Sequence, residues 1–427
     1  MSDLQRVVIT GMGVVSPNGI GLEQFNSAIK SGVSGVRFVP ELEINKFRCQ
    51  LAGVPPLNDL DKSNFKSKYQ LSNLKSSGIL YGLMAVEEAW IDAGLAGVYS
   101  ASKSLETGCI FGTGSNGVEA SNYGINILNT LGSQGSDGTN VLQVLNSGVS
   151  AYIAAVFRLG NMISSNASAC NTGTEALLNG ALRIKMGLAD RMVVGSSESD
   201  SPYVWAPFDA MFATAQGFNS IPEKASCPMS KFAAGFVPSS GAGAFVIENL
   251  HTAKLRGAKI YAELLGGAIN SGGQRGDGTM TLGNLNGMIK CIEDSLKIAG
   301  VKPADLDLLC GHLSSTVGDV REIQSWTAAL NLSKTKFPFI NSMKSMIGHC
   351  LSASGSIETI ATVLQLRNRY IHPSLNAEQL HPEIESLILS SVIPKSTIYK
   401  DLRIAAKVSL GFGDVNSCII LKRWDGN

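Results

Sequence analysis

Charged side chains are scarce in this sequence of 427 residues: they make up 16% of it, against 44% hydrophobic residues. The formal net charge is only +1, so no basic surface points to nucleic acid as a partner. No apolar run is long enough to cross a bilayer, and residues 1–6 contain no signal-peptide stretch. We therefore expect a cytoplasmic protein that hides apolar faces in its core and in a subunit interface.

Paired cysteine motifs are also absent. The eight cysteines include no Cys-x-x-Cys pair and are dispersed over positions 49, 109, 170, 227, 291, 310, 350 and 418. Such dispersal is typical of reduced thiols in a cytosolic protein. The sequence therefore predicts neither a disulfide framework nor a zinc site.

No linker or low-complexity segment interrupts the chain, which instead indicates two halves of similar plan, residues 1–250 and 251–427. Each half is predicted to run strand, helix, strand, helix, strand, strand, and apolar strands that alternate with helices imply α/β sheets buried on both faces. The predicted elements of the first half are Arg6–Val15, Gly82–Ala93, Thr107–Gly112, Thr172–Gly187, Arg191–Gly195 and Gly243–Glu248. Those of the second half are Ile260–Ala268, Gly287–Ala299, Leu306–Cys310, Gly355–Arg367, Arg403–Val408 and Cys418–Lys422.

One cysteine stands among small residues, in the segment Ser168-Ala169-Cys170-Asn171-Thr172-Gly173. Apolar residues of helical period follow from Ala176 to Ile184 without a proline, which places Cys170 at or just before a helix N-terminus. The unpaired N–H groups and the positive dipole end there favour a thiolate and can receive an oxyanion. Taken alone, a cysteine such as Cys170 is more often a buried structural residue than a nucleophile.

Two of the five histidines lie in turns rich in glycine and serine. His312 follows the short apolar segment Leu306–Leu309 and enters a hydroxyl-rich loop. His349 closes the segment Lys344-Ser345-Met346-Ile347-Gly348-His349, before a second helical pattern. A lone histidine is more often structural than catalytic. A catalytic role for these two is therefore favoured only because the chain also contains Cys170 in its small-residue segment.

Together these segments resemble the elongating β-ketoacyl-acyl-carrier-protein synthases, which are condensing enzymes of the thiolase superfamily. The order of Cys170, His312, the Lys344–His349 motif and Gly411-Phe412-Gly413 is highly specific, and the resemblance runs over nearly the whole chain. It implies a five-layered α-β-α-β-α fold built from two similar halves. The first half would carry the cysteine and the second the histidines and the lysine, with the helices after Cys170 and His349 at the centre.

The resemblance also implies the chemistry, a decarboxylative Claisen condensation. Cys170 matches the nucleophile that holds the acyl group, and His312 and His349 match the donors to the enolate formed from malonyl-acyl-carrier protein. Lys344 would add positive potential, with Glu358 as its support. The backbone N–H groups of Cys170 and Phe412 would form the oxyanion hole.

Other positions match supporting parts of the family site. Ser314 and Thr316 correspond to the hydroxyls that bind pantetheine, and Asn416 lies in the C-terminal Gly/Phe loop as a supporting residue. Phe412 would gate the acyl pocket, and Ser115 stands where a bulky apolar residue usually narrows it. No metal or redox cofactor is implied, since the substrates travel on the phosphopantetheine of the carrier protein.

Several neighbours of these residues depart from the common family pattern. Leu313 and Val317 flank the hydroxyls after His312, Ser239-Ser240 replaces Gly-Glu, and Asp414 replaces a glycine after Phe412-Gly413. The departures leave the condensation in place but put ordinary fatty-acid substrates in doubt. A specialised polyketide or polyene synthase is the alternative within the family.

The resemblance leaves partners to be decided. A non-catalytic chain-length-factor-like subunit shares the fold, but such subunits have lost the nucleophile that this chain retains. We expect a dimer, either with a second copy or with such a paralogue, and docking of an acidic acyl carrier protein. Lysines around Phe65 and Tyr69 could form the docking surface or an ordinary solvated loop; they are Lys62, Lys66, Lys68 and Lys75.

Overall fold

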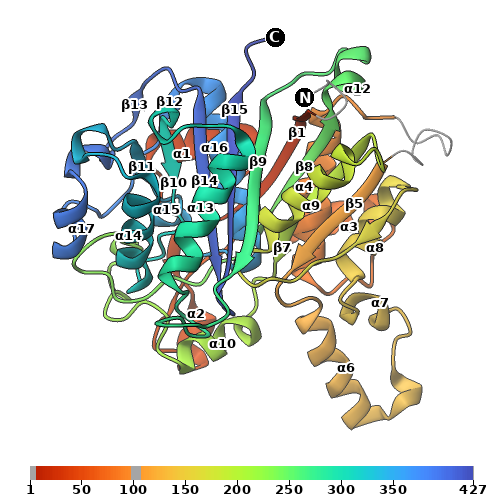
Figure 1. Cartoon of the computed structure of the whole chain (residues 1–427). Coiled ribbons are helices and arrows are strands. Elements are labelled where there is room, and N and C mark those ends of the chain that lie inside the picture. Colours follow the sequence, from red (N-terminus) through yellow and green to blue (C-terminus); the bar gives the residue numbers. More distant parts are fainter. Residues whose placement is uncertain (1–5, 98–106, 427) are drawn as a thin grey trace.

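The strands of the two halves take equivalent places in the computed structural model, which describes residues 6–97 and 107–426 (Figure 1). The first half contributes, in sheet order, β1 (Val7–Ser16), β8 (Gly241–Asn249), β7 (Arg191–Glu198), β5 (Thr107–Thr113) and β6 (Ile163–Ser164). The second contributes β9 (Ala262–Ser271), β15 (Val415–Arg423), β14 (Ile404–Gly411), β10 (Leu308–Cys310) and β11 (Phe339–Asn341). The order of strands along the chain is the same in both halves, which confirms the predicted repeat.

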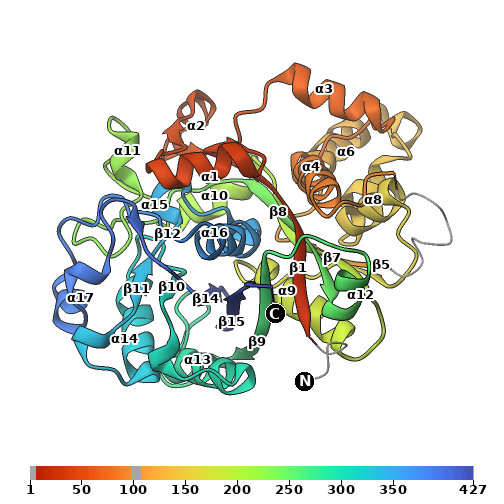
Figure 2. The same ribbon diagram turned by 90° about the horizontal axis from the view of Figure 1, so that it is seen from above.

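Strand β1 joins the two halves. It pairs along most of its length with β8, and through Val7, Val8 and Ile9 it also pairs with β9, at Ala262–Leu264. The two sheets expected from the family fold are therefore hydrogen-bonded into one continuous sheet. It bends at this short junction, so its two halves face each other across the centre of the molecule (Figure 2).

Two helices fill the space between these sheet halves, α9 (Thr172–Lys185) and α16 (Ser354–Asn368). Each contacts strands of both halves, and Figure 2 shows α16 enclosed between β8 and β14. Every residue of α16 from Ser354 to Leu366 is buried, as a helix covered on all sides requires. Their position confirms the predicted central layer.

The two central helices cross at their N-terminal ends because glycines stand at the contact. A Cβ atom on Gly173 would lie 2.4 Å from Oγ of Ser356, and one on Gly355 would lie 2.7 Å from the backbone nitrogen of Thr174. Only residues without a side chain allow this approach. The crossing brings the segments that precede the two helices, and with them Cys170 and His349, to one point.

Amphipathic helices cover the outer faces of the sheet. On the first half lie α4 (Ser77–Asp92) and α8 (Gly148–Phe157), and on the second α13 (Leu285–Ala299), with α14 (Gly318–Leu330) packed beside it. Helix α13 turns Met288, Cys291, Ile292 and Leu296 inward. The succession of helix, sheet, helix, sheet and helix is the predicted five-layered thiolase-like fold.

All twelve predicted elements are present, with ends that differ by up to five residues. Strands β6 and β11, helices α8 and α14, and two helices that project from the body, α6 (Val118–Leu131) and α7 (Asn140–Val144), were not predicted (Figure 1). The remaining elements are β2 (Gly19–Ile20), α1 (Leu22–Ser31), β3 (Val36–Phe38), α2 (Pro40–Ile44), β4 (Leu51–Gly53), α3 (Asp59–Lys68), α10 (Pro202–Ala210), α11 (Pro222–Ala225), α12 (Leu250–Leu255), α15 (Lys344–Ile347), β12 (Tyr370–Ile371), α17 (Pro382–Leu387) and β13 (Ile398–Tyr399), with short 3₁₀ turns at Ser133–Gly135, Pro303–Asp305, Lys334–Lys336, Leu351–Ala353 and Ser390–Val392.

Two predictions concern the chain as a whole. The expected boundary between residues 250 and 251 falls at the start of α12. The prediction on a signal peptide rests mainly on residues 1–5, which lie outside the described part. Within residues 6–97 and 107–426, no helix combines the length and the apolar character needed to span a membrane.

Candidate active site

Cys170 lies two residues before α9, on a tight turn that its neighbours hold in place. Ala169 takes a left-handed conformation with φ +50°, which costs free energy for a residue with a Cβ atom. Thr172 fixes the turn, because its Oγ1 donates to the carbonyl of Ala169 at 2.7 Å and accepts from the N–H of Ser168 at 3.0 Å. The turn directs the sulfur into a cavity of about 410 Å³.

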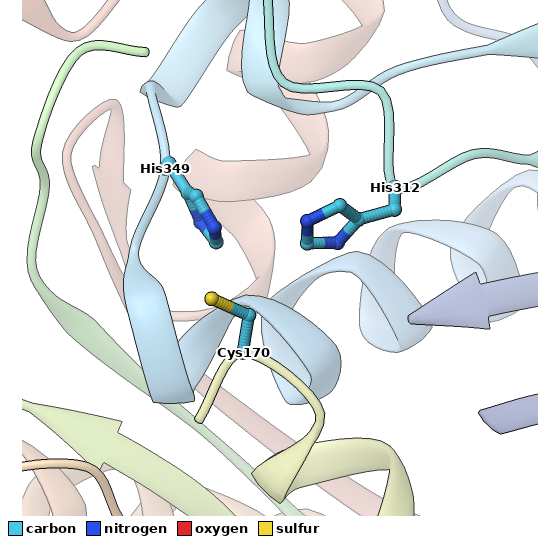
Figure 3. A group of neighbouring side chains, drawn as sticks. All are labelled: Cys170, His312 and His349. Atoms are coloured by element: carbon cyan, nitrogen blue, oxygen red, sulfur yellow. The ribbon is translucent and has the colours of Figure 1, made fainter. Parts of the chain in front are cut away.

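Three side chains predicted as catalytic meet at this cavity (Figure 3). The sulfur of Cys170 and one ring nitrogen each of His312 and His349 all lie within 4.8 Å of one another. The two imidazole rings stand edge to face, with centroids 5.1 Å apart. His312 comes from the loop after β10 and His349 from the segment between α15 and α16, so both halves of the chain form the site.

The hydrogen bonds of His349 determine which of its nitrogens carries the proton. The backbone N–H of Leu351 donates to Nδ1 at 3.2 Å, and Oγ of Ser354 lies 2.9 Å from the same atom. Since Nδ1 accepts a hydrogen bond from the backbone, the neutral ring holds its proton on Nε2. His349 therefore presents an N–H donor to the cavity.

His312 presents a donor in the same way. The ammonium of Lys344 lies 3.4 Å from Nδ1 of His312, and an ammonium can only donate. Burial, the charge of Lys344 and the charge of Lys407 lower the pKa of both histidines well below the ordinary value. Both rings are therefore neutral near pH 7 and direct Nε2–H groups at the same space.

The state of Cys170 differs from the expectation. Burial raises the pKa of its thiol to about 12, and the positive charge of Lys344 opposes this only in part. Cys170 is only 8% exposed, and a thiolate there would lose most of its hydration, which is the main cause of the raised pKa. The resting residue is a thiol rather than the predicted thiolate, and it must give up its proton during acyl transfer.

Two carboxylates of α14, which were not predicted as functional residues, hold the loop that carries His312. Glu322 accepts the backbone N–H groups of His312 at 2.8 Å and Leu313 at 2.7 Å. Asp319 accepts those of Ser314 and Ser315 at 2.6 and 3.1 Å. Burial raises the pKa of Glu322 to about 7 despite these donors. The only sequence feature that could have indicated this role is the position of Asp319 and Glu322 shortly after the predicted His312 loop.

Lys344 and Glu358 form the predicted pair, deep in the interior: their side chains are 1% and 2% exposed. A second lysine, Lys407 on β14, lies 3.0 Å from the other oxygen of Glu358. In the sequence, Lys407 is one residue of a predicted apolar strand and matches no motif. The site therefore contains two ammonium groups on one carboxylate.

Aromatic rings form one wall of the cavity. Phe412 packs on Phe208 at 5.9 Å between ring centroids, Phe208 on Phe236 at 5.5 Å, and Phe236 on His349 at 5.2 Å. The turn of Phe412 is anchored by Asp414, which accepts the backbone N–H groups of Gln274 and Asn284, both at 2.8 Å. The unusual Asp414 thus ties the Phe412 turn to the loop before α13.

The remaining predicted residues lie around this cavity with one exception. Ser314, Thr316 and Asn416 line it, and Oγ of Ser314 lies 3.1 Å from Oγ1 of Thr316. Ser115, in the turn between β5 and α6, is half-buried and is not among the lining residues. Its role in an acyl pocket stays a prediction.

The oxyanion hole and the docking lysines also stay predictions. The backbone N–H groups of Cys170 and Phe412 donate to no other backbone group of the described residues, and both residues line the cavity. On α3, Lys68 is paired with Glu87 at 2.6 Å, whereas burial and the neighbouring Lys62 and Lys75 lower the pKa of Lys66. None of the four lysines lines the cavity.

Cys170, His312 and His349 also have the composition of a metal site. Their hydrogen bonds argue against a resident ion, because a ligating imidazole needs a free lone pair. Here donors occupy Nδ1 of both rings, and the Nε2 atoms that face the cavity carry the protons. The ligand set fits donation to an anion better than coordination of a metal.

Comparison with known proteins agrees with this geometry. Residues 4–253 match the model of the β-ketoacyl synthase N-terminal domain, and residues 261–378 match that of the C-terminal domain. The chain belongs to the β-ketoacyl synthase family. As a member, the synthase is an acyltransferase of the condensing-enzyme class.

Its similarity to individual relatives extends over the whole chain. It is 31% identical to the 3-oxoacyl-[acyl-carrier-protein] synthase 1 of Buchnera aphidicola subsp. Schizaphis graminum, over 99% of this chain and 100% of that protein. It is also 31% identical to the 3-oxoacyl-[acyl-carrier-protein] synthase 2 of Rhizobium meliloti, with the same coverage. A solved structure of a type II PKS acyl-carrier protein in complex with its ketosynthase, bound to the hexaketide, superposes with a TM-score of 0.86 at 28% identity, covering 98% of this chain and 99% of that one.

Proposed function

We propose that this synthase condenses an acyl group, held as a thioester on Cys170, with malonyl-acyl-carrier protein to give β-ketoacyl-acyl-carrier protein and CO₂. The observation that carries the proposal is the meeting of one thiol and two neutral imidazole donors in one cavity. A nucleophile faces the place where negative charge develops, and the donors are already oriented toward it.

The first half-reaction loads the enzyme. The sulfur of Cys170 attacks the thioester of the incoming acyl-carrier protein, and its proton passes to the pantetheine thiolate that leaves. The carbonyl oxygen becomes an oxyanion at the N–H groups of Cys170 and Phe412. Ser314 and Thr316, which line the cavity, hold the pantetheine arm through their hydroxyls.

The second half-reaction makes the carbon–carbon bond. Loss of CO₂ from the malonyl group leaves an enolate whose oxygen accepts from Nε2–H of His312 and His349. The enolate carbon then attacks the acyl thioester, and Cys170 leaves as a thiolate that takes up one proton. These steps need no metal or redox cofactor, because every proton and electron pair is supplied by the thiol, the substrates and water.

The alternative of a non-catalytic chain-length-factor-like subunit finds no support in this site, because the nucleophile and both donors are present. We place the protein in the cytoplasm, since all eight cysteines are unpaired thiols. The substrate class is open to either a fatty-acid or a polyketide or polyene chain. The departures at Leu313, Val317 and Asp414 all lie in loops beside the cavity, where they favour a specialised chain.

A dimer is the second part of the proposal. The projecting helices α6 and α7 expose large apolar side chains, with Ile125, Leu128 and Leu131 on α6 exposed by 57%, 55% and 65%. Strand β6, in the same half of the chain, forms an edge of the sheet. An exposed apolar arm and an open sheet edge are each typical of a subunit interface, with a second copy or a paralogue as partner.

Light scattering tests the dimer. Leu128→Lys together with Leu131→Lys should convert the dimer to a monomer at micromolar concentration. Leu255→Lys is the matched control, because Leu255 on α12 is 74% exposed but lies away from the arm. A monomeric wild-type protein would exclude a homodimer, and co-expression with a chain-length-factor-like paralogue would then test the heterodimer.

Intact-mass analysis tests the reaction itself. Acyl-carrier protein should add one acyl group to the enzyme, and malonyl-carrier protein should then remove it as β-ketoacyl-carrier protein. Cys170→Ala should abolish loading. Cys310→Ala is the control, because Cys310 is buried nearby but does not line the cavity. Acylation that survives in Cys170→Ala would refute the proposal.

A further inference from the structure

Lys407 is a fully buried cation on β14, on the side of the strand that covers the two central helices. Its Nζ lies 3.0 Å from Oε2 of Glu358 on α16 and 3.2 Å from Oγ1 of Thr174 on α9, and it contacts the hydroxyl of Ser409. Within the described residues, no well-directed hydrogen-bond donor reaches Oε2 of Glu358. The contact with Lys407 is therefore mainly one of charge.

The other oxygen of the same carboxylate pairs with Lys344. Two ammonium groups thus share one carboxylate, and the three side chains together carry a net charge of +1. All three are at most 2% exposed. A buried charge without a full counter-charge is costly, so a lysine without a function at this position would be disfavoured against an apolar residue of similar length.

The excess charge lies where the reaction can use it. Lys407 reaches Thr174, in the first turn of the helix that follows Cys170, and Lys344 reaches Nδ1 of His312. An enolate or oxyanion in the cavity is stabilised by positive potential in a site that excludes water. A Glu358 carboxylate paired with Lys344 alone would cancel that potential.

We infer that Lys407 is a positioning residue for the condensation: by taking up one half of the Glu358 carboxylate, it leaves Lys344 with an uncompensated positive charge beside His312. This inference deepens the proposed function and rests on it. Its consequence for the histidines is direct, because the charges of Lys344 and Lys407 both lower the pKa of His312 and His349. Neutral rings keep their Nε2–H groups directed at the cavity.

The titratable groups around Lys407 come from four elements and from the two loops that carry the histidines. Glu358 on α16 and Lys344 on α15 act on it most strongly by charge. The other groups within its electrostatic reach are Cys310 on β10, Cys418 on β15, His312 and His349, and both imidazoles are neutral near pH 7. Both thiols are buried, and burial raises the pKa of each to about 12. Near neutral pH the charge around Lys407 is therefore set by Glu358 and Lys344 alone.

Charge balance provides the test. Lys407→Met fills the same space and brings the cluster to zero net charge, whereas Lys407→Met with Glu358→Gln returns it to +1 through Lys344. Release of CO₂ from malonyl-carrier protein should fall on the order of tenfold in the single variant and recover in the double variant. Titration of both histidines by NMR should show midpoints that rise in Lys407→Met, fall in Glu358→Gln and return in the double variant.

Each outcome decides the inference. Wild-type CO₂ release and unchanged histidine midpoints in Lys407→Met would overturn the inference. A double variant whose loss of activity is the sum of the two single losses would also overturn it. If the residues act through packing, the effects of the two substitutions add, whereas if they act through charge, the effects cancel. If Lys407→Met does not fold, the same comparison is made with Lys407→Gln. A wild-type protein that releases no CO₂ would refute the proposed function instead, while the midpoints would still report on Lys407.

Discussion

The backbone N–H of Leu351 donates to Nδ1 of His349 at 3.2 Å, and this leaves Nε2 as the protonated nitrogen beside Cys170. A main-chain donor cannot be withdrawn without moving the start of α16. The tautomer is therefore a property of the fold, and it makes His349 a donor to an anion rather than a base for the thiol.

The first prediction separates the two half-reactions. His312→Ala and His349→Ala should each lower CO₂ release from malonyl-carrier protein by about 10²-fold or more, because each removes a donor to the enolate. Acylation of Cys170 should be less affected. His349→Gln, which retains a side-chain N–H, should lose less than His349→Ala. Equal losses in acylation and in CO₂ release would contradict the division of roles.

The second prediction concerns pH. Glu322 accepts the N–H groups of His312 and Leu313 with one carboxylate oxygen each, and burial raises its pKa to about 7. Protonation converts one of these oxygens into a hydroxyl and weakens the hold on the His312 loop, so activity should fall as the pH decreases through 7. In Glu322→Gln, activity should be low throughout and this limb should vanish from the pH–rate profile.

Glu198 provides the matched control for that profile. Burial raises its pKa to about 7 as well, but it accepts from Ser352 at 2.7 Å and holds no part of the His312 loop. Glu198→Gln should keep the acid limb. The negative charge of Glu198 raises the pKa of Cys170, so this variant should also alkylate faster at Cys170. If Glu198→Gln loses the acid limb and Glu322→Gln retains it, then Glu198 rather than Glu322 is the group that titrates.

The third prediction concerns the helix crossing. Gly173→Ala would place a methyl group against Ser356 and should destabilise the protein by about 1–3 kcal/mol, because the central layer cannot expand. It should also lower activity, since it moves Cys170 away from His349. Gly138→Ala is the control, because a Cβ there would meet nothing within 4 Å. Thermal unfolding and condensation rates measure both effects.

The fourth prediction concerns the carrier protein. Lys62 and Lys66 on α3 have no ion pair within the described residues, whereas Lys68 is held by Glu87. Lys62→Glu with Lys66→Glu should raise KM for the acidic carrier and flatten its salt dependence, and a small thioester mimic should turn over as before. Lys297→Glu on α13 is the control. An unchanged KM would move the docking surface elsewhere.

The fifth prediction concerns Ser115. If it borders the acyl pocket, Ser115→Phe should shift selectivity toward shorter acyl chains, measured as the ratio of kcat/KM for short and long acyl-carrier proteins. Ser115→Ala should leave that ratio unchanged. An unaltered chain-length profile in Ser115→Phe would remove Ser115 from the pocket.

Hydrophobic period was enough to predict the repeated elements, because long buried strands and helices leave a regular pattern. It did not reveal β6 and β11, which have only two and three residues, nor the longer helices α6, α8 and α14 outside the repeated plan. It predicted the surroundings of Cys170 but not the state of its thiol, which depends on burial by segments far apart in the chain.

The buried cluster of Lys344, Glu358 and Lys407 shows the same limit of prediction from a local sequence pattern. Lys407 stands in an apolar strand 49 residues after Glu358, and no local pattern relates the two. Their contact exists because β14 lies on α16 in the folded chain. Residues that match a motif can be recognised from the sequence, whereas those that act through a buried partner emerge only from the packing.

The continuous sheet makes the two halves of the chain depend on each other for their structure. Each half repeats the other in strand order, yet α9 and α16 are both covered from two sides, once by strands of their own half and once by strands of the other. Separated at α12, each half would expose one face of its central helix and the edge of its sheet at β1 or β9. The repeat describes the topology, but folding and catalysis belong to the pair, so neither half is an autonomous module that could be exchanged between synthases without its complement.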